Sequence, residues 1–211
     1  MLTRLQITVA LGIAAIAWWF VLLAQGTPVS ADHLRPFFTV VGALVVCVVV
    51  AEHWAWRWHF LQGWLMSRPD LRGTWKVTIA SEWVDPQTNE KLPPIIAYAG
   101  VVQTQSKLQI HLMTPESESC LLASSITPTM CGERFDIAVV YANTPIVSLR
   151  GVRSERHVGA AIITTHGPSK YKPESMTAEY WTDRRSVGRM TFEGRTAAVY
   201  SRHEDAKGNL G

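Results

Sequence analysis

The fold is decided by one stretch, Thr177–Phe192, whose sequence is TAEYWTDRRSVGRMTF. Polar and apolar residues alternate along both of its arms, as in β-strands, and a turn is expected at Arg185 and Ser186. On the return arm Met190 and Phe192 share one face, which is therefore predicted to point into a core. The stretch as a whole predicts a β-hairpin.

The outgoing arm of this hairpin carries polar side chains on the face that should point inward. Tyr180, Thr182 and Arg184 follow Met176 and Ala178 at two-residue spacing, so this face begins apolar and ends polar. The polar residues either reach water at a strand end or line a polar site inside the protein. The hairpin alone leaves both interpretations open.

The composition excludes several classes of protein. A chain of 211 residues is long enough for one ordinary domain and a smaller part. Its net charge of +3 argues against a protein that coats DNA or RNA, because such proteins carry a dense basic stripe. Cys47, Cys120 and Cys131 are odd in number and form no CxxC pair, so neither a disulfide framework nor a metal site is expected. No cofactor is predicted.

The N-terminal part, residues 1–66, contains two apolar runs at about 5–24 and 37–58. Each run is long enough to supply the roughly 20 residues that cross a bilayer, and the link between them is short. The sequence therefore predicts a transmembrane helical hairpin. Arg4 precedes the first run and Arg57 begins a basic excess at the end of the second, which predicts that both termini are cytoplasmic.

Two other interpretations of this N-terminal part stay open. Ala24-Gln25-Gly26 loosely resembles a processing site, so the first run could be a cleaved signal peptide. Alternatively, both helices cross the membrane but serve only as an anchor, because an anchor and a membrane-disrupting hairpin have the same sequence pattern.

The pattern changes at about residue 67, where apolar residues begin to alternate with polar ones. Residues 67–195 are predicted to form a domain of about eight short antiparallel strands, which is typical of a small closed up-and-down β-barrel or a sandwich. The expected strands lie at about 75–81, 96–104, 107–114, 117–127, 134–143, 157–165, 176–184 and 188–192. The predicted fold class is thus a membrane-anchored all-β protein. Residues 196–211 lose the alternation and are predicted to be a disordered tail.

In an up-and-down barrel the polar inward residues would gather at one end, the mouth away from the helices. The opposite end would be lined by apolar residues such as Trp75, Val77, Ile137 and Phe192, with Gln103 as a polar exception. A barrel of about eight strands can hold one small ligand, so the mouth is the predicted ligand site. Its candidate ligand-binding residues are Ser81, Trp83, Thr114, Ser117, Ser119, Tyr141, Asn143, His157, Tyr180, Thr182 and Arg184.

The link before the sixth strand adds Arg150, Arg153 and Arg156. Guanidinium groups pair well with phosphate, so these residues are predicted to form a phosphate-binding rim, although they could equally be ordinary surface charge. Aromatic faces such as those of Tyr141 and Tyr180 can stack on unpaired nucleobases. Together with Arg184, these features favour an anionic, base-containing ligand.

Six short motifs, in this order and spacing, resemble a bacterial effector family. They are Leu71–Trp75 (LRGTW), Ser81–Trp83 (SEW), Thr114–Ser119 (TPESES), Tyr141–Pro145 (YANTP), His157–Gly159 (HVG) and Tyr180–Arg184 (YWTDR). The family is the SMODS-associated family of two transmembrane helices plus a β-strand-rich domain, which are anti-phage effectors of CBASS systems. The resemblance covers nearly the whole chain except the tail.

The resemblance implies a function that the residues alone do not establish. It implies that the barrel binds a cyclic dinucleotide, a cyclic oligonucleotide messenger made by a cGAS/DncV-like nucleotidyltransferase after phage infection. Binding would drive self-association into oligomers, and the helices would then disrupt the bilayer of the bacterial inner membrane and kill the cell. No DNA or RNA polymer is expected as a partner.

Two other functions are weighed against this one. A membrane-anchored, lipocalin-like carrier or sensor of a small lipophile would use the same barrel but would not need Arg184 or the arginine-bearing link. An enzyme could draw a triad from Ser117 or Ser119, His157 and Asp183, but no nucleophile elbow is present and Asp183 has the parity of an outward residue. No catalytic residue is therefore predicted.

Overall fold

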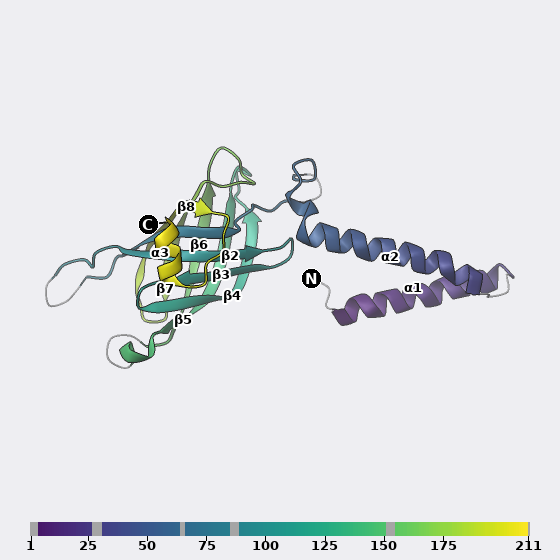
Figure 1. Ribbon diagram of the computed structural model, residues 1–211, viewed down its shortest axis with the longest axis horizontal. Helices are drawn as coiled ribbons and strands as arrows, with labels where there is room; N and C mark the ends of the chain where they lie inside the picture. The colour runs from purple at the N-terminus through teal and green to yellow at the C-terminus, as the bar shows by residue number, and fades with distance from the viewer. Residues whose placement is uncertain (1–3, 27–30, 64–65, 85–88, 151–154, 211) are drawn as a thin grey trace. The chain divides into compact units, whose positions relative to one another are not determined.

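A computed structural model describes residues 4–26, 31–63, 66–84, 89–150 and 155–210 (Figure 1). The chain divides into two compact units, Met1–Trp56 and Arg57–Gly211. The first unit is helical and the second contains all of the strands.

The first unit contains the two helices that the apolar runs predicted, α1 (Arg4–Ala24) and α2 (Ala31–His53). The second helix ends at His53 rather than near residue 58, and a single 3-10 turn, η1 (Ala55–Arg57), follows it. Within the parts of the chain that the structure describes, no helix combines the length and the apolar character needed to cross a membrane.

The second unit is a closed barrel of eight antiparallel strands in up-and-down order (Figure 1). The predicted barrel is confirmed, and the sandwich is excluded because β1 pairs with β8 and closes the sheet. The strands are β1 (Gly73–Ser81), β2 (Ile95–Gln103), β3 (Leu108–Met113), β4 (Ser117–Pro128), β5 (Phe135–Pro145), β6 (His157–His166), β7 (Ser175–Thr182) and β8 (Val187–Thr196).

The predicted hairpin is formed by β7 and β8, but its turn is longer than expected. The strands end at Thr182 and resume at Val187, so Arg184 lies in the turn and not in the strand. The Thr182 N–H donates to the Ser186 carbonyl at 3.0 Å, and the two hydroxyls lie 2.6 Å apart. Arg185 adopts a left-handed φ of 61°, which reverses the chain within this tight turn.

The barrel interior is apolar at the end where the chain enters β1. Trp75, Val77, Ile137 and Phe192, the residues predicted to line this end, are 3% exposed or less and belong to one core cluster. Their burial is the main driving force for closing the barrel, because each large apolar side chain removed from water contributes about 1.5–3 kcal/mol.

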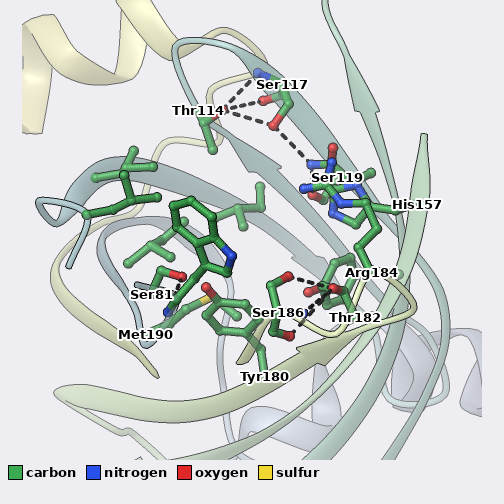
Figure 2. Close-up of a pocket in the computed structure, with 17 residues that line it drawn as sticks. Ser81, Thr114, Ser117, Ser119, His157, Tyr180, Thr182, Arg184, Ser186 and Met190 are labelled. Atoms are coloured by element: carbon green, nitrogen blue, oxygen red, sulfur yellow. Dashed lines mark hydrogen bonds between the residues drawn. The ribbon is translucent and has the colours of Figure 1, made fainter. Parts of the chain in front are cut away.

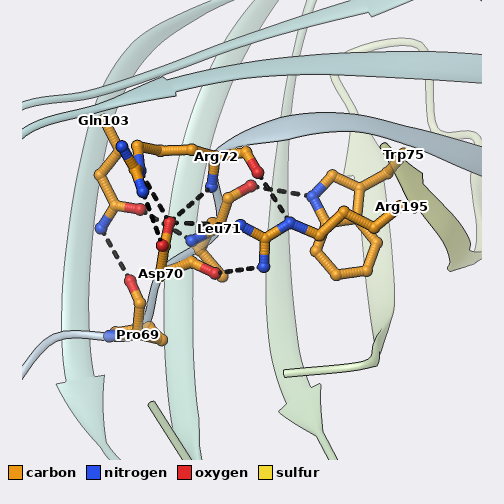
Figure 3. A network of polar contacts seen from close by, with 7 residues as sticks. All are labelled: Pro69, Asp70, Leu71, Arg72, Trp75, Gln103 and Arg195. Atoms are coloured by element: carbon orange, nitrogen blue, oxygen red, sulfur yellow. Dashed lines mark hydrogen bonds and ion pairs between the residues drawn. The ribbon is translucent and has the colours of Figure 1, made fainter. Parts of the chain in front are cut away.

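Gln103, the polar exception at this end, forms hydrogen bonds to the backbone that precedes β1 (Figure 3). Its amide oxygen accepts from the Leu71 N–H, and its amide nitrogen donates to the Pro69 carbonyl, both at 2.9 Å. The Trp75 indole N–H donates to the Leu71 carbonyl at 2.8 Å. The buried amide thus satisfies the backbone of the segment that leads into β1 and fastens it across the end of the barrel.

An ion-pair network closes the same end (Figure 3). The Arg72 guanidinium donates two hydrogen bonds to the Asp70 carboxylate, at 2.9 and 2.8 Å. Arg195, at the end of β8, donates to the carbonyls of Arg72 and Asp70 and lies 5.3 Å above the Trp75 ring. Burial opposes ionisation of Asp70, but the hydrogen bonds and charge of Arg72, with the charge of Arg195, hold its pKa below the ordinary value.

The prediction of a disordered tail is wrong, because the end of the chain packs on the outer wall of the barrel. Thr74 Oγ1 donates to the Ala198 carbonyl at 2.8 Å and accepts from the Tyr200 N–H at 2.9 Å. Helix α3 (His203–Leu210) then lies against β1, β2 and β8. Its Ala206 is completely buried and clusters with Tyr98 and Met113, two outward-facing residues of the barrel.

Candidate functional site: a polar cup in the barrel mouth

A cavity of about 630 Å³ occupies the end of the barrel opposite to the apolar core (Figure 2). This cavity, the cup, has a volume within the range of ordinary small-molecule sites. All of the ligand-binding residues predicted from the sequence line it: Ser81, Trp83, Thr114, Ser117, Ser119, Tyr141, Asn143, His157, Tyr180, Thr182 and Arg184. The structure thus brings these residues together, while their role as ligand contacts stays a prediction.

One wall of the cup is polar because of the strand register. Ser119 on β4 lies opposite Asn143 on β5, and Asn143 lies opposite His157 on β6. The three side chains therefore stand in one row across adjacent strands on the inner face. This wall is thus formed by inward-pointing side chains of β4, β5 and β6 at the mouth end of the barrel.

Hydrogen bonds hold this polar wall rigid. The Asn143 amide nitrogen donates to the hydroxyls of Ser117 and Ser119 at 3.0 and 2.8 Å. The Thr114 hydroxyl lies 3.1 Å from that of Ser117 and accepts from the Ser117 N–H at 2.8 Å (Figure 2). Asn143 is only 8% exposed, and its amide oxygen has no hydrogen-bond partner among the described residues.

Two tyrosines also line the cup, each opposite a glycine on the neighbouring strand. Tyr141 faces Gly159 across β5 and β6, and Tyr180 faces Gly188 across β7 and β8. Burial, followed by the nearby Tyr180 and Asp183, raises the pKa of Tyr141 to about 12. The Tyr141 phenol is therefore neutral at physiological pH and offers an O–H donor and an aromatic face.

The charge of the cup is set by one residue. Among the described residues that line it, Arg184 carries the only permanent charge, and none is acidic. Arg184 comes from the turn between β7 and β8 and, like His157, lines the cup (Figure 2). A guanidinium at a partly apolar cavity whose described lining contains no acidic residue favours an anionic ligand.

The two described residues of the predicted arginine rim are not among the residues that line the cup. Arg150 and Arg156 are absent from the lining residues, and the Arg150 Nε donates to the Pro145 carbonyl at 3.0 Å. Arg153 lies outside the described residues. The guanidinium that the structure places at the cup is therefore Arg184, while a role for the others is still a prediction.

Several lining residues were not predicted from the sequence: Ile79, Leu92, Ile95, Leu112, Ser186 and Met190. Ile79, Ile95, Leu112 and Met190 have inward parity just below the polar residues, so the same alternation identifies them once the depth of the cup is known. Leu92 lies in the long link between β1 and β2, where no periodicity exists to place it.

The space beneath the cup bears on the lipophile alternative. A second, wholly apolar cavity lies deeper in the barrel and measures only about 40 Å³. This space is far smaller than the roughly 300 Å³ or more of an ordinary small-molecule pocket. The barrel thus offers a cavity of mixed polar and apolar lining at its mouth, with only this small apolar space beneath it.

The residues considered for a catalytic triad have other partners. The His157 Nδ1 lies 3.1 Å from the Glu155 carbonyl, which can only accept, so Nδ1 is the donor. The Asp183 carboxylate accepts from the Val158 N–H at 3.1 Å. Asp183 therefore anchors the turn between β7 and β8 to β6.

The comparisons with known proteins agree with this geometry. No curated protein matches the chain. Residues 66–194, more than half of the chain and nearly the whole barrel, match the family model described as Cap15, cyclic dinucleotide receptor domain. The chain therefore belongs to the Cap15 family, the CBASS effectors in which a β-barrel senses a cyclic dinucleotide.

Proposed function

We propose that the cyclic dinucleotide binds in the cup, with its phosphates toward Arg184 and its bases toward Tyr141 and Tyr180. The observation that carries this proposal is that a cavity of about 630 Å³ holds one permanent cation and no acid. Guanidinium groups bind phosphate through paired hydrogen bonds, and aromatic rings stack on bases of any identity. The serine and threonine hydroxyls supply further donors at the polar wall.

The direct experiment is a calorimetric titration of the full chain in detergent with cyclic di-GMP, cyclic di-AMP and cyclic GMP-AMP. At least one of them is expected to bind, and excess AMP or inorganic phosphate should compete poorly because neither reaches both tyrosines and Arg184. Binding of none of the three, or displacement by detergent-soluble lipid, would refute the proposal.

The barrel is the sensor, and the helical unit is the effector. α1 and α2 anchor the chain in the bacterial inner membrane, with both termini in the cytoplasm. Support comes from the two apolar runs and from large apolar side chains that are exposed on the helices, such as Ile13, Phe20 and Val46. The protein acts by binding and assembly and not by catalysis.

Ligand binding leads to cell death in three steps. A cGAS/DncV-like nucleotidyltransferase makes the messenger after phage infection, the ligand-bound barrels self-associate, and the assembled helices disrupt the membrane. A ligand can drive self-association only if it binds the assembled state more tightly than the single chain.

The role of the helices is tested by exchange. Residues 1–56 are replaced with an unrelated two-helix membrane anchor, and the cells are supplied with the activating nucleotide. Loss of killing with retained ligand binding is the expected result. Killing by the exchanged protein would mean that the native helices serve only as a tether.

A further inference from the structure

Gly159 occupies an unusual position in the cup wall. It lies on β6 directly opposite Tyr141, and a Cβ atom at this residue would stand 2.4 Å from both the Cζ and the hydroxyl oxygen of Tyr141. The phenol end of Tyr141 therefore fills the space that the side chain of any other residue would need. Real Cβ atoms do not approach other heavy atoms this closely.

The backbone does not explain this glycine. The φ of Gly159 lies outside the left-handed region, so other residues can adopt its conformation. The three atoms nearest to such a Cβ all belong to the Tyr141 side chain. The closest contacts that disfavour a larger residue at this position thus come from Tyr141.

Gly188 forms the companion pair with Tyr180, but with a second constraint. A Cβ there would stand 2.7 Å from Tyr180 Cε1 and 2.3 Å from the carbonyl oxygen of Ala80. Because backbone cannot swing aside, substitution of Gly188 would disturb the closure of β1 and β8 itself. Substitution of Gly159 should therefore move the Tyr141 phenol without displacing the backbone of the barrel wall, whereas substitution of Gly188 should displace both.

We propose that Gly159 is a positioning residue of the ligand site, which lets the Tyr141 phenol lie against the barrel wall as a stacking surface for one base. Tyr180, lying over Gly188, is the matching surface for the second base of the cyclic dinucleotide. This inference rests on the proposed function. A methyl group at residue 159 drives the Tyr141 ring into the cup, because the wall blocks the opposite direction.

The test is a double-mutant cycle in the full chain, with affinity for the three cyclic dinucleotides measured by calorimetry. Gly159→Ala and Tyr141→Ala are each expected to weaken binding by about tenfold or more, the order of one lost stacking contact. The double variant should bind no more weakly than Tyr141→Ala alone, because Gly159 acts only through that ring. Unchanged affinity of Gly159→Ala, or a loss that adds fully to that of Tyr141→Ala, would overturn the inference.

A matched control and a spectroscopic measurement separate positioning from a general loss of stability. Gly208→Ala adds the same methyl group in α3, where no atom lies within 4 Å of a Cβ, and should leave affinity unchanged. Ultraviolet titration of tyrosinate should show the raised pKa of Tyr141, about 12, in the native chain. In Gly159→Ala that pKa should fall toward 10, the ordinary value. A titration that does not move would also overturn the inference.

Failure of the proposed function and failure of the inference about Gly159 would give different results. If the native chain binds none of the three nucleotides, the proposed function is wrong, while the tyrosinate titration still decides whether Gly159 sets the position of Tyr141. If the native chain binds but the cycle is additive, only the role of Gly159 is wrong.

Discussion

At the scale of single residues, Arg184 is expected to contribute to ligand binding but not to the stability of the fold. Its side chain lies in an exposed turn and lines the cup, so it can contribute to binding without supporting the core. Arg184→Ala is expected to weaken cyclic dinucleotide binding by about 1.5–3 kcal/mol, the usual contribution of a hydrogen bond to a charged group. Calorimetry measures the affinity, and the melting temperature should stay the same.

The matched control for this substitution is Arg189→Ala. Arg189 points outward from β8, is 74% exposed and lies 3.8 Å from Glu179 on the outer wall. It should change neither affinity nor melting temperature. Equal losses of affinity in both variants would mean that net charge, and not the cup, governs binding.

Asp70 is expected to make stability depend on acid pH. Its pKa is lowered in the folded protein, so the Asp70 carboxylate stabilises the fold above its unfolded pKa of about 3.9. This stability is lost as the pH falls through the lower, folded pKa. Asp70→Asn should therefore lower the free energy of unfolding at pH 7 by about 1–3 kcal/mol, with a smaller difference below pH 4.

Urea unfolding at several pH values measures this effect. Glu193→Gln, which neutralises an exposed carboxylate on β8, is the control and should differ little from the native chain at any pH. A deficit of Asp70→Asn that stays constant down to the lowest pH would contradict the assignment.

At the scale of elements, α3 is expected to stabilise the barrel from outside. Ala206→Glu places a charged side chain at a completely buried position against Tyr98 and Met113. It should lower the free energy of unfolding by about 2–3 kcal/mol, because a buried carboxylate without a partner is costly. Thermal unfolding measures the loss, and Lys207→Glu, at an exposed position of the same helix, should cost less than about 0.5 kcal/mol.

The elements also show what the sequence can and cannot predict. The predicted strand positions agree with the structure because the barrel interior is apolar and its exterior is polar. Apolar and polar residues therefore alternate along each strand. The same parity predicted the lining of the cup, since side chains such as Ser119, Asn143 and His157 can only point inward. Parity carries no information in turns, which is why Arg184 was assigned to a strand and Leu92 was not identified.

The tail was mispredicted for a different physical reason. α3 is eight residues long and buries essentially one small side chain, Ala206, so its sequence has almost no apolar period. Its partners, Tyr98 and Met113, look like ordinary exposed residues on the polar face of their strands. A short helix fixed by tertiary contacts leaves no local signal in the sequence.

At the scale of the whole molecule, ligand binding should stabilise the barrel in proportion to occupancy. A ligand that binds only the folded state adds about 2.7 kcal/mol at a concentration of 100 times Kd. A thermal-shift series with increasing cyclic dinucleotide is expected to show a melting temperature that rises with the logarithm of concentration. For Arg184→Ala, a higher ligand concentration should be needed for the same rise in melting temperature. A melting temperature that does not change with ligand concentration would contradict binding in the cup.

The closure of β1 onto β8 has a consequence for assembly. An open sheet ends in unpaired N–H and C=O groups that can recruit a strand from another chain, whereas pairing of β1 with β8 removes the edge that each of these strands would otherwise expose. Neither β1 nor β8 can therefore take up a strand from another chain, as the edge strands of an open sheet can. In the proposed self-association this seam stays closed, and each receptor domain keeps its own β1 and β8.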